Sequence, residues 1–328
     1  MEVRFVNLSK KYKKILSVSR AKNLVFGIMF ALIIFGLSYL FLFPLFYLIS
    51  TAFQSAESLL DPSVVWLPRS FSLENIKETF KIMDFGNSAF LTARITIFST
   101  AASLLSCSLV GYGLARYKVP EGKFIFMLVI LTIILPPQAT LISSYLNFRF
   151  FDFGGLLRLL EPITGFSSIN LLNTEWTFIL PAIFANGLRS GLFIFLFKQF
   201  FTGLPKEIEE AAKIDGCGAF KTYWQIMLPM AKAAIVTVLL FSTVWHWNDL
   251  YTAAMYFIEG TQPVMPTLDS LLNIMAQEGL MESMNASQDY LRVYIASGAL
   301  LAILPPLVIY LVFQRLFTES IAKTGIVG

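Results

Sequence analysis

Long apolar runs without a charged residue dominate this chain. Four of them contain no Asp, Glu, Lys or Arg, and they cover 24–49, 95–115, 124–148 and 293–314. A helix rises about 1.5 Å per residue, so it needs about 20 apolar residues to cross roughly 30 Å of hydrocarbon. Each of these four runs therefore predicts a helix that spans a membrane.

Two further runs have interruptions. The run at 176–197 is broken only by Arg189, and the run at 233–248 reaches the necessary length when its flanks are included. We therefore expect an all-α polytopic membrane protein with six transmembrane helices. Their predicted positions are about 24–50, 92–115, 124–148, 176–198, 229–251 and 292–314.

The composition agrees with a membrane protein. Hydrophobic residues make up 56% of the chain, charged residues only 14%, and the mean hydropathy is +0.68. Soluble domains carry about 25% charged residues. An ordinary cytosolic enzyme and a nucleic-acid-binding protein are therefore excluded. Cys107 and Cys217 lie in different surroundings far apart in the sequence, which favours two unpaired structural thiols over a disulfide.

Positive charges are distributed unevenly over the predicted loops. Of the 25 Lys and Arg, 17 precede the first span, follow the sixth, or lie between spans two and three or four and five. Positive residues concentrate on the cytoplasmic side of membrane proteins. We therefore expect both termini in the cytoplasm, with 1–23 as a basic N-terminal segment and 24–328 as the transmembrane domain.

The one long predicted cytoplasmic loop, 198–232, has the pattern of a folded element. Pro205 suits the start of a helix, and the acidic residues that follow it suit the positive end of the helix dipole. Gly216 provides a left-handed stop, and a second helix is expected from about Ala219 until Pro229 ends or kinks it. An apolar stripe at helical spacing marks that second helix, namely Phe220, Tyr223, Trp224 and Met227.

This loop resembles the EAA loop of the inner-membrane permease subunits of binding-protein-dependent ABC importers. The resemblance is carried by Glu210-Ala211-Ala212, Asp215-Gly216, and Ile226, Leu228 and Pro229 at the family's spacing. Within that family the chain is similar to the carbohydrate branch, related to the second maltose permease subunit. The resemblance implies the MetI-like permease architecture.

Weaker similarities in the same order extend from about residue 24 to 328. They include Gly113-Leu114-Ala115-Arg116-Tyr117, Leu135-Pro136-Pro137, Leu172-Asn173-Thr174, Trp247-Asn248-Asp249 and Gln314-Arg315-Leu316-Phe317. The chain departs from the family where Ala233 stands in place of a usual proline. A second departure is an outer loop that is longer than usual at 151–170.

The resemblance implies a division of labour among several proteins. A second, different permease would complete the translocation pathway, two cytoplasmic ATPase subunits would bind the loops, and an external solute-binding protein would deliver a carbohydrate. The chain has no phosphate-binding GxxxxGK[ST] loop, so we expect it to be non-catalytic and to bind no cofactor, with ATP and magnesium held by the ATPase. It would be a multi-pass protein of the cell membrane.

The residues expected to couple this chain to the ATPase lie in the 198–232 loop. Glu210 would contact an ATPase cation, Gly216 would form the bend, and Phe220 and Trp224 would seat the second helix or pack on the permease itself. The full predicted set is Glu210, Ala211, Ala212, Asp215, Gly216, Phe220, Trp224, Leu228 and Pro229.

Polar residues within the predicted spans are candidates for the translocation pathway. A charge at membrane depth costs at least ~2.5 kcal/mol unless it faces protein or water. The candidates are Asn186, Arg189, His246, Asn248 and Asp249. An Arg189–Asp249 pair is conceivable, and bonding between helices without ligand contact is the alternative for each residue.

Three other functions are alternatives to an importer of carbohydrates. An intramembrane enzyme lacks its motifs, because the chain has one histidine and neither HExxH nor GxSxG. A secondary transporter would be expected to show an inverted repeat, which the sequence does not display, and would leave the EAA pattern unexplained. An ABC permease for a solute other than a sugar is the stronger rival.

Overall fold

We analysed a computed structural model, which describes residues 2–55, 70–277, 279–280 and 288–324. The regular elements of this part of the chain are helices, with two isolated β-bridges, Gln54–Phe71 and Phe151–Ile169. The first half of the chain contains α1 (Glu2–Ala52), α3 (Glu74–Ile82), α4 (Phe85–Arg116), α5 (Gly122–Ile134), η1 (Pro137–Thr140), α6 (Leu141–Arg149) and α7 (Leu156–Thr164). The second half contains α8 (Trp176–Ile183), α9 (Ser190–Gly203), α10 (Glu207–Ile214), α11 (Ala219–Thr222), η2 (Tyr223–Met227), α12 (Leu228–Met230), α13 (Lys232–Trp247), α14 (Tyr251–Tyr256), α15 (Val264–Asp269), α16 (Leu271–Gln277) and α18 (Gln288–Thr324).

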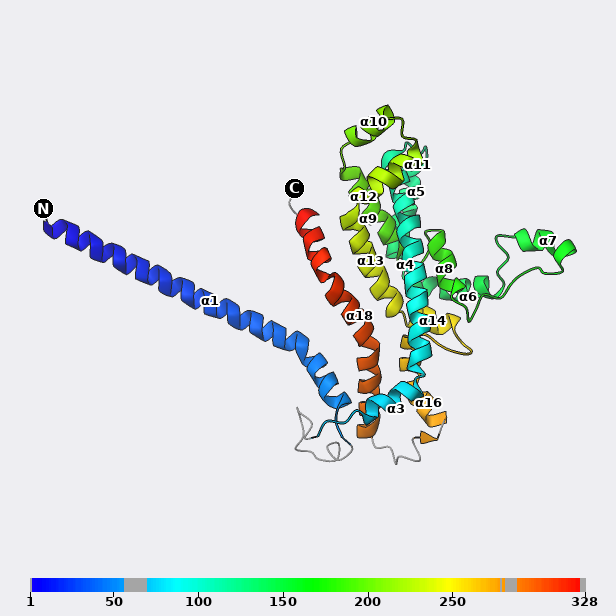
Figure 1. Cartoon of the computed structure of the whole chain (residues 1–328), viewed down its shortest axis with the longest axis horizontal. Coiled ribbons are helices and arrows are strands. Elements are labelled where there is room, and N and C mark those ends of the chain that lie inside the picture. The colour runs from blue at the N-terminus through cyan, green and yellow to red at the C-terminus, as the bar shows by residue number, and fades with distance from the viewer. Residues whose placement is uncertain (1, 56–69, 278, 281–287, 325–328) are drawn as a thin grey trace.

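A bundle of α4, α9, α13 and α18 forms the body of the molecule (Figure 1). The element α10–α11 lies at one end of this bundle, and α3 and α16 lie at the other (Figure 1). We call these the α10 end and the α3 end. The α4 helix runs between the two ends and packs most extensively on α9. That close packing needs Gly111, because a Cβ there would approach Cβ of Phe197 to 2.6 Å.

The α4 helix contacts its neighbours through small hydroxyl side chains. Ser99, Ser103 and Ser108 are fully buried. Thr100 Oγ1 is 2.9 Å from Ser242 Oγ of α13, and Ser106 Oγ donates to the carbonyl of Ala182 at 2.6 Å. Small residues let helix backbones approach closely in a membrane, and hydroxyl bonds between helices replace the hydrophobic force that lipid cannot provide. The Ser/Thr content of α4 therefore reflects helix–helix packing.

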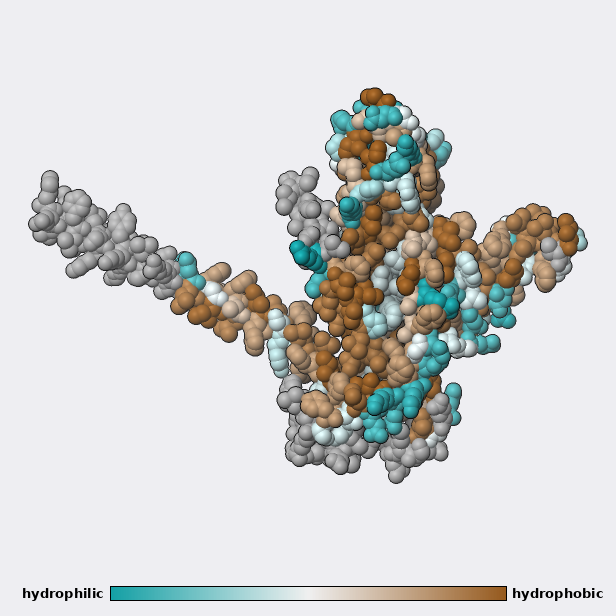
Figure 2. Space-filling view, viewed as in Figure 1, coloured by the Kyte–Doolittle hydropathy of each residue, from teal (hydrophilic) through white to brown (hydrophobic). Residues whose placement is uncertain are grey.

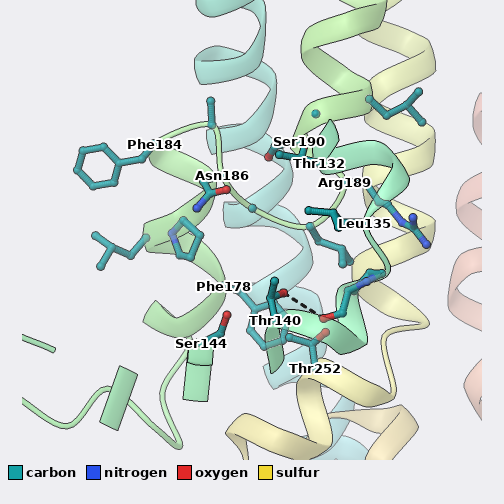
Figure 3. Close-up of a pocket in the computed structure, with 18 of the residues that line it drawn as sticks. Thr132, Leu135, Thr140, Ser144, Phe178, Phe184, Asn186, Arg189, Ser190 and Thr252 are labelled. Atoms are coloured by element: carbon teal, nitrogen blue, oxygen red, sulfur yellow. Dashed lines mark hydrogen bonds between the residues drawn. The ribbon is translucent and has the colours of Figure 1, made fainter. Parts of the chain in front are cut away.

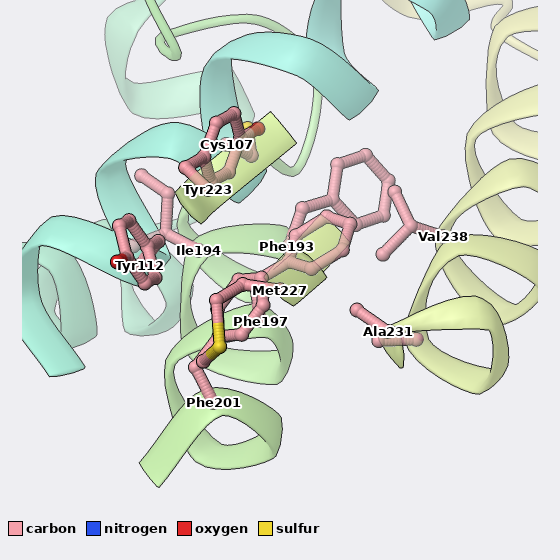
Figure 4. Packing of buried hydrophobic residues seen from close by; sticks show 11 residues of the cluster. Cys107, Tyr112, Phe193, Ile194, Phe197, Phe201, Tyr223, Met227, Ala231 and Val238 are labelled. Atoms are coloured by element: carbon pink, nitrogen blue, oxygen red, sulfur yellow. The ribbon is translucent and has the colours of Figure 1, made fainter. Parts of the chain in front are cut away.

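Aromatic side chains fill the core near the α10 end. Figure 4 shows Phe193, Phe197 and Phe201 of α9 gathered with side chains from α4, η2 and α13. These three phenylalanines are fully buried, and burying a side chain of this size stabilises the fold by about 1.5–3 kcal/mol. The spacing of four residues places all three on one face of α9. The cluster connects α9 to the elements around it.

The α1 helix leaves the bundle and extends away from it (Figure 1). Its C-terminal end contacts the rest of the chain, where Ala52 and Leu48 pack with Ala296 and Leu300 of α18. Its apolar side chains from Leu24 to Phe41 are almost all exposed, and they form the brown surface along the helix in Figure 2. This helix is therefore built to be covered by lipid or by another chain.

Three predicted spans are found as long, continuous apolar helices. Within the described residues these are Lys22–Ala52, Phe85–Arg116 and Leu291–Arg315. Up to five spans result if each of two bent helix pairs is counted as one. The six-span count and the side on which the termini lie stay predictions.

The predicted span at 124–148 is not a straight helix. It consists of α5 followed by η1 and α6, and the two parts are bent by 103°. The bend lies at Pro136 and Pro137, which lack the N–H of a regular helix, and Leu135 before them is extended with ψ at 126°. With 13 residues, α5 alone is about 20 Å long, which is shorter than the hydrocarbon core.

The predicted span at 176–198 is interrupted in its middle. The α8 helix ends at Ile183 and α9 begins at Ser190. Between them, Ala185 and Arg189 have left-handed backbones with φ of 55° and 59°. The chain turns back on itself here, because the N–H of Asn186 donates to the carbonyl of Pro181 at 2.8 Å. The interruption by Arg189 noted in the sequence therefore marks a broken helix.

Candidate functional site

The 198–232 loop folds as a helix, a bend and a second helical segment, as its sequence predicts. Asp215 and Gly216 follow α10, and Gly216 has φ at 78°. The N–H of Gly216 donates to Lys213, and that of Cys217 donates to Ala212. This pair of bonds is the Schellman ending that a left-handed glycine permits. The bend is therefore set by local sequence and reverses the chain before α11.

The predicted coupling residues in and after α10 differ in their exposure to solvent. Ala212 is buried, whereas Glu210 and Ala211 are exposed to solvent. Asp215, at the end of the helix, is exposed as well. Glu210, Ala211 and Asp215 can therefore contact another protein, while Ala212 holds the helix against the body.

The apolar stripe of the second helical segment, α11 and η2, has two buried and two exposed members. Tyr223 and Met227 are buried in the cluster of Figure 4, but Phe220 is 72% exposed and Trp224 is 49% exposed. The rings of Phe220 and Trp224 are stacked, with centroids 6.4 Å apart and planes 11° from parallel. Both rings also contact the ring of Tyr223, so the alternative of packing on the permease itself describes only one side of each ring. They form an exposed aromatic pair at the α10 end.

Two contacts to α4 hold this segment in place. The hydroxyl of Tyr223 is 2.7 Å from Ser108 Oγ. The ring of Tyr223 also lies against the ring of Tyr112, with centroids 5.2 Å apart. Tyr223 and Ser108 are both buried, so the two hydroxyls satisfy each other. The exposed aromatic pair therefore rests on a rigid base.

An ion pair between Arg116 and Glu209 was not foreseen from the sequence. Arg116 Nε and Glu209 Oε1 are 3.7 Å apart, with side chains 5% and 14% exposed. Arg116 also donates to the carbonyl of Leu204 at 2.8 Å. The sequence signals at Arg116 were a positive charge at the end of a span and its place in the run Gly113-Leu114-Ala115-Arg116-Tyr117, and neither of them points to Glu209. This pair joins α10 directly to the end of α4.

The helix loses its regular geometry just before Pro229. Residues 223–227 form a π-helical turn, and the direction of the chain changes by 77° around Ala231. Proline has no N–H for the carbonyl four residues earlier, and its ring crowds that carbonyl, which favours a wider turn. Leu228 is half-buried beside the aromatic cluster, and Pro229 is exposed. The predicted kink is present, two residues after the proline.

A cavity of about 960 Å³ lies between α5, η1 and α6 on one side and α8 and α9 on the other. Figure 3 shows the residues that line it. Apart from Arg189, its polar side chains carry hydroxyls and amides, and among them are Thr132, Thr140, Ser144, Asn147, Thr177, Asn186, Ser190, Thr252 and Tyr256. The bend in one predicted span and the break in another together form this space.

Arg189 and Asn186, both predicted for the pathway, line the cavity. The guanidinium of Arg189 lies 5.6 Å from the centre of the Trp245 ring, in a cation–π contact with α13. No ion pair joins Arg189 to Asp249 in the described part of the chain. The conceivable pairing of these two residues is therefore corrected, and Trp245 takes the place of the carboxylate.

The other three predicted pathway residues lie outside this lining. His246 is 4% exposed, and its Nδ1 is 2.8 Å from the carbonyl of Ser242. Asp249 accepts bonds from the N–H groups of Thr252 and Ala253, which caps the start of α14. Asn248 is exposed. Asp249 thus has structural contacts, in line with the alternative of bonding without ligand contact, whereas Nε2 of His246 is buried with no hydrogen-bond partner among the described residues.

Comparison with known proteins adds an independent view. Residues 107–323 match the model of the family described as binding-protein-dependent transport system inner membrane component. Protein LplC of Bacillus subtilis (strain 168) is 27% identical to this chain over 93% of it and 95% of LplC. The melibiose/raffinose/stachyose import permease protein MelC of the same organism is 29% identical over 86% of this chain and 91% of MelC.

A solved structure has the same fold. In the crystal structure of a bacterial ABC transporter involved in the import of the acidic polysaccharide alginate, one chain is similar with a TM-score of 0.65. The match covers 89% of this chain and 96% of that one, at 20% identity. The family match covers more than half of the sequence and includes the 198–232 loop. This protein belongs to the family of binding-protein-dependent transport system inner membrane components.

Proposed function

We propose that this chain is one of two different permease subunits in an ABC importer for a carbohydrate. It forms half of the translocation pathway, crosses the membrane six times and keeps both termini in the cytoplasm. Two cytoplasmic ATPase subunits supply the energy, and an external solute-binding protein delivers the sugar. The α10 end then faces the cytoplasm, in agreement with its lysines.

The observation that carries this proposal is the exposed surface formed by Glu210, Ala211, Phe220 and Trp224. Large aromatic side chains that stay exposed on a rigid base are typical of protein interfaces. Glu210 adds a carboxylate that can pair with a cation on the partner. This surface lies on the loop whose sequence resembles the ATPase-docking loop, and that loop lies at the α10 end of the bundle (Figure 1).

Carbohydrate is supported by the cavity and by the relatives. Hydroxyl and amide groups suit the many hydroxyls of a sugar, and the volume of about 960 Å³ is near the upper end of common ligand sites. MelC is named for the neutral sugars melibiose, raffinose and stachyose, whereas the structural neighbour imports an acidic polysaccharide. We therefore assign a saccharide as the substrate class.

The contacts suggest how force would reach the pathway. Movement of the ATPase would displace α10 and α11, and the Arg116–Glu209 pair and the Tyr223–Ser108 contact would pass that displacement to α4. The bend at Ala231 would allow α13 to change its direction relative to α11. Two packed arrangements of these elements would correspond to the two states of the pathway.

Replacement of the aromatic pair tests the proposal. We expect W224A and F220A each to lower recovery of the ATPase with the purified transporter about tenfold or more, because hot-spot aromatic residues contribute about 2 kcal/mol or more to an interface. Insertion and pairing with the second permease should stay normal. F71A, an equally exposed phenylalanine at the α3 end, is the control. Unchanged ATPase recovery in both variants would contradict the docking assignment.

A further inference from the structure

Arg189 is the one permanently charged side chain among the described residues that line the cavity. The other polar groups of the lining are the hydroxyls and amides named above. A guanidinium stays protonated at any physiological pH. A ligand in this cavity therefore meets a fixed positive charge.

The position of Arg189 is determined by the broken helix. It is the last residue of the 184–189 interruption and has a left-handed backbone, with φ at 59°. Its side chain extends from the start of α9 (Figure 3), and the guanidinium lies over the ring of Trp245 in α13. Strained backbone of this kind is found mainly at functional sites. The arginine is thus held at the cavity wall by both its backbone and its aromatic neighbour.

The contact with Trp245 leaves the positive charge uncompensated. The face of an aromatic ring attracts a cation but carries no net charge, and the contact contributes only about 0.5–2 kcal/mol. A charge at membrane depth costs more than this unless it meets water or a counter-charge. The five N–H donors of a guanidinium cannot all be used by one ring face. The geometry leaves donors available to a ligand.

The start of α9 adds to the positive electrostatic potential around Arg189. This helix has 14 residues and begins at Ser190, so the positive end of its dipole lies beside Arg189. Ser190 also lines the cavity, and its buried hydroxyl interacts with the thiol of Cys107. The helix end and the guanidinium together favour an anionic group.

We propose that the cavity binds a saccharide that carries a carboxylate, and that Arg189 binds this carboxylate. The inference rests on the proposed carbohydrate function and narrows it from saccharides in general to acidic ones. A planar guanidinium can hold a carboxylate through two parallel hydrogen bonds. The uncharged hydroxyls and amides then bind the sugar hydroxyls around it. A neutral saccharide would leave the arginine without a counter-charge.

The experiment uses the complete transporter, with its second permease, ATPase and binding protein, in proteoliposomes. Uptake is measured for acidic oligosaccharides that contain galacturonate, glucuronate or alginate units, and for neutral oligosaccharides of equal length. For the transported acidic sugar, binding to the permease pair is measured without the binding protein. The same sugar with its carboxyl groups converted to methyl esters is the matched neutral ligand.

We expect wild-type permease to bind the acid about tenfold or more tightly than its ester, since hydrogen bonds between charged groups contribute about 1.5–3 kcal/mol. R189Q should remove this preference while ester binding changes little, and R189K should retain part of it. The preference should fall as salt is raised. R158Q on α7, an exposed arginine outside the cavity, is the control and should behave as wild type.

Two outcomes would overturn the proposal while leaving the importer function intact. One is transport of neutral oligosaccharides alone. The other is an acid preference that survives in R189Q, especially if that variant also recovers less of the second permease, because the counter-charge would then belong to the partner subunit. Failure to transport any saccharide would instead reject the carbohydrate function, and the acidic substrate with it.

Discussion

In the Arg116–Glu209 pair, each buried charge offsets the desolvation cost of the other. Both side chains are largely buried, so removal of one leaves the other without its counter-charge. For R116A we expect α10 to open by local unfolding, which lets water reach the Glu209 carboxylate. The cost should be about 1–3 kcal/mol, measured as faster hydrogen exchange of the α10 amides.

The double variant R116A/E209A provides the control for this prediction. With both charges removed, no buried carboxylate remains, so α10 should exchange more slowly than in R116A alone. Exchange in R116A that equals the wild type would show that the pair does not hold α10 in place. Any coupling energy between the two positions follows from the complete double-mutant cycle.

Gly191 gives a second residue-level prediction, based on shape. A Cβ at this position would lie 2.2 Å from Thr132 Oγ1 and 3.0 Å from the carbonyl of Val129. G191A should therefore push α9 away from α5 and lower the stability of the complex by about 1–3 kcal/mol, measured by thermal unfolding in detergent. T132A should restore part of the loss, because the Val129 carbonyl still remains in the way.

Gly113 is the matched control for Gly191. It also lies within a helix, but a Cβ there would meet no atom within 4 Å. G113A should leave the unfolding temperature unchanged or raise it slightly, since alanine loses less backbone entropy on folding. Equal destabilisation by G113A and G191A would indicate that the close approach of α9 and α5 is unimportant.

Sequence reasoning at the residue scale succeeded where the local pattern determines the conformation. Gly216 was identified as the left-handed stop because the helix before it and the glycine are adjacent in sequence. It failed for Glu209, because its partner Arg116 is 93 positions away and no local pattern joins the two residues. The Arg189–Asp249 pairing failed for the same reason, since proximity in the fold cannot be obtained from one sequence.

At the scale of elements, the π-helical turn sets the direction of the exposed aromatic pair. P229A would restore an N–H and remove the ring that crowds the helix, so residues 223–227 should relax toward a regular α-helix. Each residue of shift rotates side chains by about 100°. Phe220 and Trp224 should then point away from the ATPase, and recovery of that subunit should fall severalfold.

P162A in α7 is the control, because Pro162 also lies inside a helix but far from the α10 end (Figure 1). It should leave ATPase recovery unchanged. If P229A recovers as much ATPase as the wild type does, the π-helical turn is not needed for ATPase docking. Circular dichroism of the two variants would show that neither loses its overall helix content.

Element prediction from the sequence was accurate for uniform runs and inaccurate for runs with interruptions. The continuous helices α1, α4 and α18 coincide with three charge-free runs. The run at 124–148 is equally apolar, but Pro136 and Pro137 bend it by 103°. Hydropathy reports whether a segment enters lipid, whereas the path of the backbone depends on which N–H groups are missing. The α8–α9 break follows the same logic, with Arg189 as its signal.

For the whole molecule, the two natural cysteines allow a direct test of orientation. Cys217 is partly exposed near the bend of the 198–232 loop, and Cys107 is buried in α4. A maleimide that cannot cross membranes should label Cys217 in inside-out vesicles and not in right-side-out vesicles. Cys107 should stay unlabelled in both. Bound ATPase should slow the labelling of Cys217, because the exposed aromatic pair lies nearby.

A cysteine on the opposite side completes the topology test. In a C217S background, R158C on α7 should be labelled only in right-side-out vesicles. Labelling of Cys217 and of R158C from the same side would contradict a single crossing of the membrane at 176–198. The labelling pattern therefore tests that crossing and the side of the membrane on which the 198–232 loop lies.

The hydroxyl face of α4 has a consequence for how the protein is made. Alone in lipid, this helix would present Ser99, Ser103 and other buried hydroxyls to hydrocarbon, whereas α1 presents an almost unbroken apolar surface. We expect α1 to leave the protein-insertion machinery as soon as it is synthesised. The α4 helix should linger there until α9 and α13 emerge, so biogenesis of this permease proceeds through the assembly of helices rather than their successive release.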